Sequence, residues 1–333
     1  ASTYSIVERY CPRLLPEIAR RIRDGRWEVT ASHWVECDKN LTGAEALCRH
    51  VLYTRKYMRK LFGLRPEDIE IDWAPDTFGH AITVPSYLVK GGIKYLYISR
   101  PGETGPERPS AFWWKGRDGT RILVRNDAGH GYNGIIDPDI ADRLFHFTVE
   151  TGLPFAMFVY GVGDHGGGPT RRDILTALEM NSWPLFPNVK FARASDFFKR
   201  LEMEGAETLP TVDYELNFEY TGCYSSQSLV KKCNRIAENR TVDAEIESAF
   251  AWTALAESYP ARLFEESWHD IMLSHFHDIL PGSCVHDSRT YAHGLFQKTM
   301  ASVISAETSA LRLLASNVDT SFAGKAAEKP GHD

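Results

Sequence analysis

The sequence predicts an α/β fold followed by a bundle of about three helices. Strand-like and helical segments alternate over the first two-thirds of the 333 residues, which is typical of a parallel sheet, open or closed into a barrel. Past Asn234 the pattern changes to long helical segments with few strand signals, at 235–257, 261–279 and 287–317. The boundary between the two parts is expected near 215–235.

Apolar spacing and local start and stop signals predict the individual elements of the first part. A capping box that begins at Thr42 opens a helix to Phe62, and Asp118-Gly119 is the turn signal of a β-hairpin. Strands are expected at 27–35, 69–73, 94–98, 155–160 and 189–191. Further helices are expected at 4–23, 84–90, 140–150, from Thr170, and from Ser195 to about Glu204.

Composition excludes several classes of protein. The net charge is −6 and Lys and Arg are scattered, so the chain lacks the basic footprint of a nucleic-acid binder. A membrane-spanning helix requires an apolar run of about 18 residues, and no run in the sequence approaches this length. The six cysteines form no C-x-x-C pattern, which predicts free thiols and a cytoplasmic location. The chain starts at Ala1 without Met and ends in a polar tail, so it is expected to be cut at both ends.

The segment from Trp73 to His80, Trp-Ala-Pro-Asp-Thr-Phe-Gly-His, carries a candidate catalytic acid, Asp76. It follows a strand-like run, and the Pro and Gly beside Asp76 direct the chain into a loop. Catalytic residues of barrels and open α/β sheets collect at this edge of the strands. Asp76 is therefore expected to face a site rather than the core.

A glycine-rich loop carries a second candidate acid, Asp164. Gly161-Val-Gly163-Asp-His-Gly166 matches a dinucleotide-binding pattern, but an anion stands where pyrophosphate would lie and no acid follows about 20 residues later. The sequence also mimics an esterase oxyanion loop, yet the chain has no G-x-S-x-G elbow. A catalytic loop is the favoured interpretation, and a plain glycine-rich turn stays open.

The third cluster is Ser274-His275-Phe-His277-Asp278, at the end of a predicted helix. A single His at such a place is more often structural. A His-x-His-Asp run favours a metal or sugar-hydroxyl site, because imidazole and carboxylate suit Zn²⁺. Acids after several strands, including Glu36 and Asp38, would converge on one pocket. Paired carboxylates are what glycoside hydrolysis requires, although a metal held by them could activate water instead.

Four segments of the chain resemble glycoside hydrolase family 38, whose members are α-mannosidases. They are Trp34-Val-Glu-Cys-Asp-Lys-Asn-Leu-Thr-Gly-Ala-Glu45, the segment from Trp73 to His80, Tyr160-Gly-Val-Gly-Asp-His-Gly-Gly-Gly-Pro-Thr170, and His275-Phe-His-Asp-Ile-Leu-Pro-Gly282. The third is similar to the bacterial and cytosolic-type branch. The segments occur in the order and spacing of the family and cover nearly the whole chain.

The resemblance implies a (β/α)7-type barrel-like domain at 1–220 without its first strand, a three-helix bundle at 221–320 and a flexible tail at 321–333. It implies a retaining α-mannosidase that removes terminal α-linked mannose from a mannose-containing oligosaccharide through a covalent glycosyl-enzyme. Asp76 matches the nucleophile and a ligand of Zn²⁺ or another divalent cation such as Co²⁺, and His277 matches a second ligand. Asp164 is the candidate general acid. The expected substrate-binding residues are Phe78, Trp73, Asp278 and Tyr132.

The chain departs from the family pattern in ways that bear on activity. The metal-binding H-x-D pair of the first barrel strand is expected upstream of Ala1, and the E-x-H-R-G-x-Y segment appears as Glu219-Tyr-Thr-Gly-Cys-Tyr224. The C-terminal β domains are absent as well. Residues 1–333 alone are therefore expected to have low or no activity. Another metal-dependent barrel hydrolase, such as a polysaccharide deacetylase, an inactive fragment, and a homo-oligomer stay open.

Overall fold

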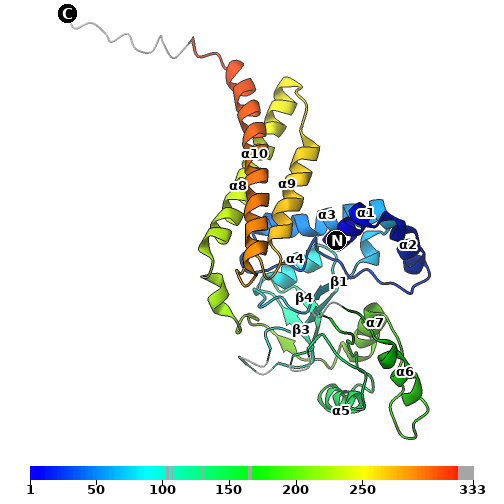
Figure 1. Ribbon diagram of the computed structural model, residues 1–333. Coiled ribbons are helices and arrows are strands. Elements are labelled where there is room, and N and C mark those ends of the chain that lie inside the picture. The colour runs from blue at the N-terminus through cyan, green and yellow to red at the C-terminus, as the bar shows by residue number, and fades with distance from the viewer. Residues whose placement is uncertain (103–104, 107, 129–130, 164–166, 322–333) are drawn as a thin grey trace, which may run out of the picture. The chain divides into compact units, whose positions relative to one another are not determined.

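The computed structural model describes residues 1–102, 105–106, 108–128, 131–163 and 167–321. It divides the chain into two compact units: residues 1–227 with 275–283, and residues 228–274 with 284–333. The first unit contains a sheet with helices, and the second contains long helices (Figure 1). The predicted α/β class with a helical region after it is confirmed, while the predicted domain limits at 220 and 320 stay predictions.

A five-stranded sheet forms the centre of the first unit, in the order β1-β2-β4-β3-β5. Its strands are β1 (Ile71–Ala74), β2 (Tyr95–Ile98), β3 (Ala111–Lys115), β4 (Arg121–Asn126) and β5 (Thr211–Val212). The pairs β1/β2, β2/β4 and β3/β5 are parallel. The pair β3/β4 is antiparallel, which confirms the hairpin predicted from Asp118-Gly119.

Both faces of this sheet are covered, so its strands are apolar almost throughout. On β2, Leu96 and Ile98 belong to one buried cluster together with Leu88 of α4 (Val84–Lys90). Tyr95 and Tyr97 point the other way, into a cluster that includes residues of α7 (Ala194–Gly205). The two-residue period of the strand therefore separates two cores.

Three helices precede the sheet: α1 (Ser2–Tyr10), α2 (Leu15–Arg23) and α3 (Ala44–Phe62). The single helix predicted at 4–23 is interrupted at Cys11-Pro12, where a 3₁₀ turn follows because proline has no amide N–H to donate. The capping box predicted at Thr42 does not form, because Gly43 rather than Thr42 is the N-cap of α3. The Thr42 hydroxyl instead donates to the carbonyl of Asp38 (2.7 Å).

The predicted strands at 27–35, 155–160 and 189–191 are not strands in the structure. At 189–191 the side chain of Asn181 accepts from Val189 N (2.8 Å) and donates to its carbonyl (2.9 Å), where a strand would use a neighbouring strand. At 27–35 the amide of Trp34 likewise donates to a side chain, His50 Nδ1 (3.2 Å). An apolar pattern favours burial, but a ladder also needs a partner backbone.

The helices α5 (Ile140–Thr151) and α6 (Arg171–Met180) complete the first unit. The predicted helix start at Thr170 is confirmed by a capping box: Asp173 N donates to the Thr170 hydroxyl (3.1 Å), and Thr170 N donates to the Asp173 carboxylate (3.2 Å). The N-cap of α7 is Arg193 rather than the predicted Ser195. The amide of Ser195 contacts Glu28 instead.

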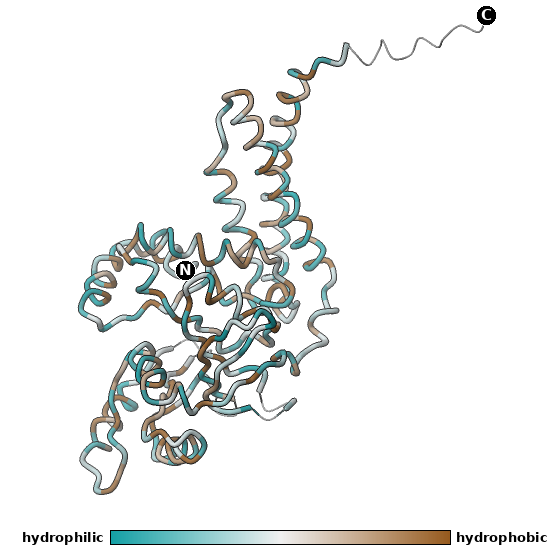
Figure 2. Tube along the Cα trace, turned by 180° about the vertical axis from the view of Figure 1, so that it is seen from behind, coloured by the Kyte–Doolittle hydropathy of each residue, from teal (hydrophilic) through white to brown (hydrophobic). Residues whose placement is uncertain are grey.

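The second unit contains α8 (Ser228–Leu255), α9 (Ala261–Ser274) and α10 (His286–Ser316), which run side by side (Figure 1). Apolar and polar residues alternate along them (Figure 2). Ala244, Phe264 and Val303 form a buried cluster. The helix predicted at 261–279 ends at Ser274. Residues 275–283 belong to the first unit because Phe276 forms a β-bridge with Cys37.

All six cysteines lie in the described part of the chain and are free thiols, as predicted. Among the described residues, no helix combines the length and the apolar character that crossing a membrane would require.

Candidate active site

The parallel strands β1 and β2 end at the same edge of the sheet, and each leads to a charged side chain there. Asp76 follows the end of β1, and Arg100 follows the end of β2. The guanidinium Nε of Arg100 donates to Asp76 Oδ1 at 2.7 Å. Because parallel strands bring their carboxyl ends together, residues far apart in sequence form this ion pair.

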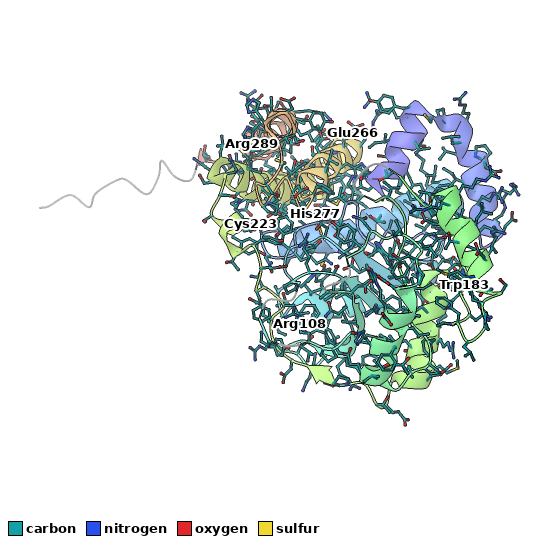
Figure 3. All side chains as sticks on the ribbon, turned by 60° about the horizontal axis from the view of Figure 1, so that its bottom comes forward. Arg108, Trp183, Cys223, Glu266, His277 and Arg289 are labelled. Carbon is teal, nitrogen blue, oxygen red and sulfur yellow. The ribbon has the colours of Figure 1, made fainter. Side chains whose placement is uncertain are left out.

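The second oxygen of Asp76 faces His277, which is labelled in Figure 3. His277 Nε2 lies 3.2 Å from Asp76 Oδ2, and the two side chains are 7% and 20% exposed. Burial opposes ionisation of Asp76, but hydrogen bonds from His277, Arg100 and Tyr132 lower its pKa to about 2. Burial also disfavours the imidazolium, but Asp76 and Glu36 raise the pKa of His277. The site therefore holds an ionised carboxylate beside an imidazole whose protonated form is favoured.

Glu36 is a second acid within this site. Its Oε2 lies 3.7 Å from His277 Nδ1, and its side chain is 19% exposed. Burial raises the pKa of Glu36, although the charge of His277 and two backbone hydrogen bonds oppose this change. The third acid of the region, Asp38, accepts hydrogen bonds from Asn40 N (2.9 Å) and Leu41 N (2.6 Å). Asp38 therefore shapes the turn after Glu36.

An aromatic and charged wall stands beside Asp76. The ring of Phe78 lies 5.2 Å from that of Tyr220 and 6.0 Å from that of His277. Arg100 donates to the Tyr220 hydroxyl (3.0 Å) and lies over its ring at 5.1 Å. Tyr220 has a left-handed backbone with φ of 54° and is half exposed. Such strained, accessible residues are concentrated at functional sites.

The structure brings together four of the residues predicted from sequence: Asp76, His277, Phe78 and Tyr132. The ring of Trp73 instead stacks on Tyr97 of the sheet at 4.0 Å. The carboxylate of Asp278 accepts from the Ser283 hydroxyl at 2.7 Å. Asp164, the predicted general acid, lies outside the described residues. The roles of these residues in catalysis and sugar binding stay predictions.

Sequence reasoning missed Arg100, although its guanidinium Nε donates to the carboxylate of Asp76 at 2.7 Å. A signal was present, because Arg100 follows a predicted strand just as Asp76 does. The same rule about strand ends, applied to basic as well as acidic residues, would have identified it.

Two side chains of the site have the chemistry of metal ligands. Asp76 Oδ2 and His277 Nε2 are adjacent and suit Zn²⁺ chemically. Within the described part of the chain, however, no group of three or more His, Cys, Asp or Glu side chains could hold a metal ion. Asp76 and His277 therefore do not make a complete metal site by themselves among the described residues.

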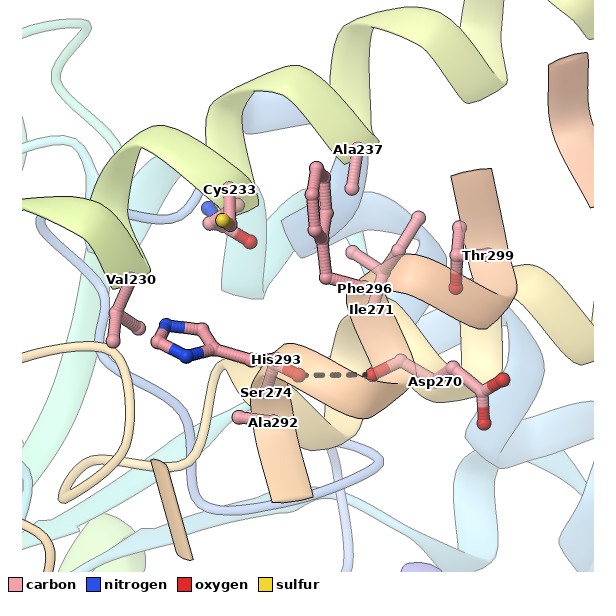
Figure 4. Close-up of a pocket in the computed structure, with 11 residues that line it drawn as sticks. Val230, Cys233, Ala237, Asp270, Ile271, Ser274, Ala292, His293, Phe296 and Thr299 are labelled. Carbon is pink, nitrogen blue, oxygen red and sulfur yellow. Dashed lines mark hydrogen bonds between the residues drawn. The ribbon is translucent and has the colours of Figure 1, made fainter. Parts of the chain in front are cut away.

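A separate cavity lies within the helical unit and does not compete with this site. Figure 4 shows that it lies between α8, α9 and α10, and its volume is ≈ 20 Å³. Apolar side chains such as Val230, Ile271 and Phe296 line it, and Ser274 Oγ donates to the carbonyl of Asp270 (3.2 Å). This volume suits about one water molecule and excludes a sugar.

Comparison with known proteins places these observations in a family. Residues 1–216 match the glycosyl hydrolases family 38 N-terminal domain, and residues 219–314 match the alpha mannosidase middle domain. The chain is 30% identical over 284 residues to an alpha-mannosidase of Saccharomyces cerevisiae, covering 80% of this chain. It is 28% identical over 291 residues to alpha-mannosidase G of Dictyostelium discoideum, covering 86% of this chain. The chain spans 26% of the length of each relative.

A solved structure has the same fold. The crystal structure of an alpha-mannosidase from Enterococcus faecalis V583 superposes with a TM-score of 0.77 at 21% sequence identity, covering 93% of this chain and 36% of that one. At this identity the likeness concerns the fold alone. Together with the match over residues 1–216, which is more than half of the chain, it leads to one conclusion: the chain belongs to glycosyl hydrolases family 38.

Proposed function

We propose that this chain carries the catalytic centre of a retaining α-mannosidase that removes terminal α-linked mannose from a mannose-containing oligosaccharide. The observation that carries the proposal is the environment of Asp76. Its carboxylate is ionised, is held by His277, Arg100 and Tyr132, and stands at the edge of the sheet beside an aromatic wall. A nucleophilic carboxylate needs this combination of a fixed geometry and a low pKa.

In this reaction an oxygen of Asp76 attacks the anomeric carbon while a general acid protonates the departing glycosidic oxygen. Water, which gives a proton back to the deprotonated general acid, then attacks the same carbon. Mannose leaves with its configuration retained, and the Asp76 carboxylate is regenerated. Arg100 and Tyr132 hold the carboxylate in both steps. The two carboxyl groups of a retaining glycosidase lie about 5–5.5 Å apart, so the general acid has to approach Asp76 this closely.

Asp164 is the proposed general acid, and contacts of described residues before it in the chain support the proposal. Gly161 N and Gly134 N each donate to the other residue's carbonyl, at 2.7 and 3.2 Å. Gly134 is close in sequence to Tyr132, which bonds to Asp76. The loop that bears Asp164 therefore starts from a segment paired with the neighbourhood of the nucleophile.

Asp76 and His277 are the proposed protein donors to a divalent cation such as Zn²⁺, with further donors from outside the described residues. When bound, such an ion would act as a Lewis acid that grips sugar hydroxyls. The test is a zinc titration of the full-length protein, followed by calorimetry. Zinc affinity should fall on His277→Ala, and an unchanged affinity would remove His277 from the ligand set.

The nucleophile is tested with the full-length protein and an aryl α-mannoside. Asp76→Ala should lower kcat by at least about 1,000-fold, because the covalent route is lost. A fluorinated mannosyl donor should label Asp76 in the unaltered protein, as detected by peptide mass spectrometry. A metal-dependent deacetylase would form no such adduct. If Asp76→Ala turns over at the normal rate, the proposed mechanism is wrong.

A further inference from the structure

Glu36 holds the backbone of the turn that carries Asp76. Its Oε1 accepts hydrogen bonds from the amide of Asp76 at 2.6 Å and from the amide of Thr77 at 2.8 Å. The hydroxyl of Thr77 lies 3.3 Å from the same oxygen and also donates to the carbonyl of Cys37 (3.2 Å). Glu36 therefore satisfies two consecutive backbone donors that the end of β1 leaves without a strand partner.

The same residue also holds the segment that carries His277. The carbonyl of Glu36 accepts from His277 N at 3.1 Å and lies 3.3 Å from His277 Nδ1. One residue further on, Cys37 forms the β-bridge with Phe276, and Asp38 N donates to the carbonyl of His275 at 2.9 Å. These contacts align residues 36–38 with residues 275–277, which are more than 200 positions later in the chain.

We propose that Glu36 is a positioning residue that sets the distance between the Asp76 carboxylate and the His277 imidazole. It contacts the turn of Asp76 through its side chain and the segment of His277 through its main chain. The positions of Asp76 and His277 therefore both depend on Glu36. This inference rests on the proposed function for its catalytic consequence, but the contacts themselves are independent of any activity.

The hydrogen-bonding role of Glu36 depends on acceptor position rather than on charge. Both backbone amides converge on one oxygen, Oε1, and an amide oxygen placed there would accept the same two bonds. Glu36→Gln keeps that oxygen and removes the charge. Glu36→Asp keeps the charge but is one methylene shorter, so its oxygens cannot reach the two amides without moving the turn. This pair of variants separates geometry from charge.

A matched control exists at the other edge of the sheet. Asp118, in the turn before β4, accepts from the amide of Thr120 at 3.1 Å and from the hydroxyl of Ser86 at 2.7 Å. It makes the same kind of bonds as Glu36, but it precedes the strand whereas the site residues follow strand ends. Asp118→Asn should leave kcat and the Asp76 turn unchanged.

Two measurements test the proposal. The first is hydrogen exchange of the Asp76 and Thr77 amides in the 333-residue chain, which does not depend on catalysis. Their protection should persist in Glu36→Gln and fall at least about tenfold in Glu36→Asp, because the bonds lengthen or break. The second is kcat of the full-length protein on an aryl α-mannoside. It should fall about 100-fold in Glu36→Asp and recover to within about fivefold of normal in Glu36→Gln.

The outcomes distinguish a failure of the positioning role of Glu36 from a failure of the proposed function. If Glu36→Gln is as slow as Glu36→Asp although it protects both amides, Glu36 acts through its charge and the positioning role is wrong. If Glu36→Asp keeps full amide protection and full kcat, the contacts of Glu36 do not position the site, and the proposal is wrong. If Asp76→Ala retains activity, the proposed function fails, whereas the exchange data still decide whether Glu36 holds the turn.

Discussion

The character of Asp76 arises from three donors that reach it from different parts of the first unit. His277, Arg100 and Tyr132 all stabilise the ionised carboxylate, and their combined effect outweighs the cost of burying its charge. Arg100 contributes a direct bond at 2.7 Å and also fixes the ring of Tyr220. At the scale of single residues, the site is a charged cluster in which each partner orients another.

Replacing Arg100 by Met should therefore weaken the reaction and change its pH dependence. The loss of a charged donor should lower kcat about 100-fold in the full-length protein. It should also raise the pKa of Asp76, because one of the groups that lower it is gone. Since the nucleophile must be ionised, the acidic limb of the pH–rate profile should move to higher pH.

The measurement is kcat/KM for an aryl α-mannoside between about pH 3 and pH 8. Arg121→Met is the matched control, because Arg121 lies over Trp113 at the start of β4, at the other edge of the sheet. Its profile should coincide with that of the unaltered protein. An Arg100 variant with an unshifted acidic limb would show that Arg100 does not control the ionisation of Asp76.

At the scale of elements, the glycine-rich loop is shaped by close contacts that permit no side chain at one position. Gly163 has φ of +60°, and a Cβ added there would lie 1.5 Å from Asn133 Oδ1. Its amide donates to the carbonyl of Gly167 at 2.7 Å, so the loop folds back on itself. The amide of Val162 likewise donates to the carbonyl of Gly168 at 3.1 Å. These two amides are thus already paired, unlike those of the open phosphate cradle of a dinucleotide site.

Gly163→Ala should therefore disrupt the loop, and Gly168→Ala should not. A Cβ at Gly168 would have no neighbour within 4 Å. The left-handed backbone of Gly163 alone costs about 1–2 kcal/mol for a residue with a Cβ, before the clash with Asn133 is added. Hydrogen exchange at Gly161 and Gly163 should accelerate only in the first variant. Equal protection in both variants would contradict the importance of this contact.

At the scale of the whole molecule, a buried charge network joins the N-terminal segment of the first unit to the sheet. Asp72 of β1 is ion-paired with Lys39, and it accepts from the Ser32 hydroxyl at 2.8 Å. His33 Nδ1 lies 3.1 Å from the same carboxylate. Burial alone would raise the pKa of Asp72, but Lys39 and His33 hold it well below its usual range.

Breaking this network should destabilise the protein more than replacing it. Asp72→Asn leaves the charge of Lys39 buried without its partner and should cost about 3–5 kcal/mol in the free energy of unfolding. Asp72→Asn combined with Lys39→Met removes both charges and should cost less. Urea denaturation at pH 7 compares the two variants with the unaltered chain. A double variant as unstable as the single one would show that the cost does not come from the unpaired lysine.

The same pair makes a prediction about acid. The pKa of Asp72 is depressed in the folded state, so its stabilising contribution is present above the unfolded pKa of about 3.9. It is lost progressively as the pH falls below that value towards the folded pKa. The stability difference between the unaltered chain and the double variant should therefore be constant from about pH 7 to 5 and change only below about pH 4.

Much of the architecture could be predicted from local pattern. The helix at 84–90 has the bounds that were expected, and the hairpin at Asp118-Gly119 follows from its turn residues. The strands predicted at 155–160 and 189–191 do not form. Their apolar residues are only partly buried, and Phe191 is exposed. Apolar periodicity favours burial, whereas a ladder depends on which backbone lies alongside.

The motifs that carry Asp76 and His277 are short, dense and in the order of the family, so the local sequence predicts that the two residues share one site. The ion pair of Arg100 with Asp76 and the contacts of Glu36 with both segments are visible only in the folded chain. These contacts join residues 24, 40 and 241 positions apart. Their partners are set by where strands end and how distant segments pack, and no local pattern contains that information.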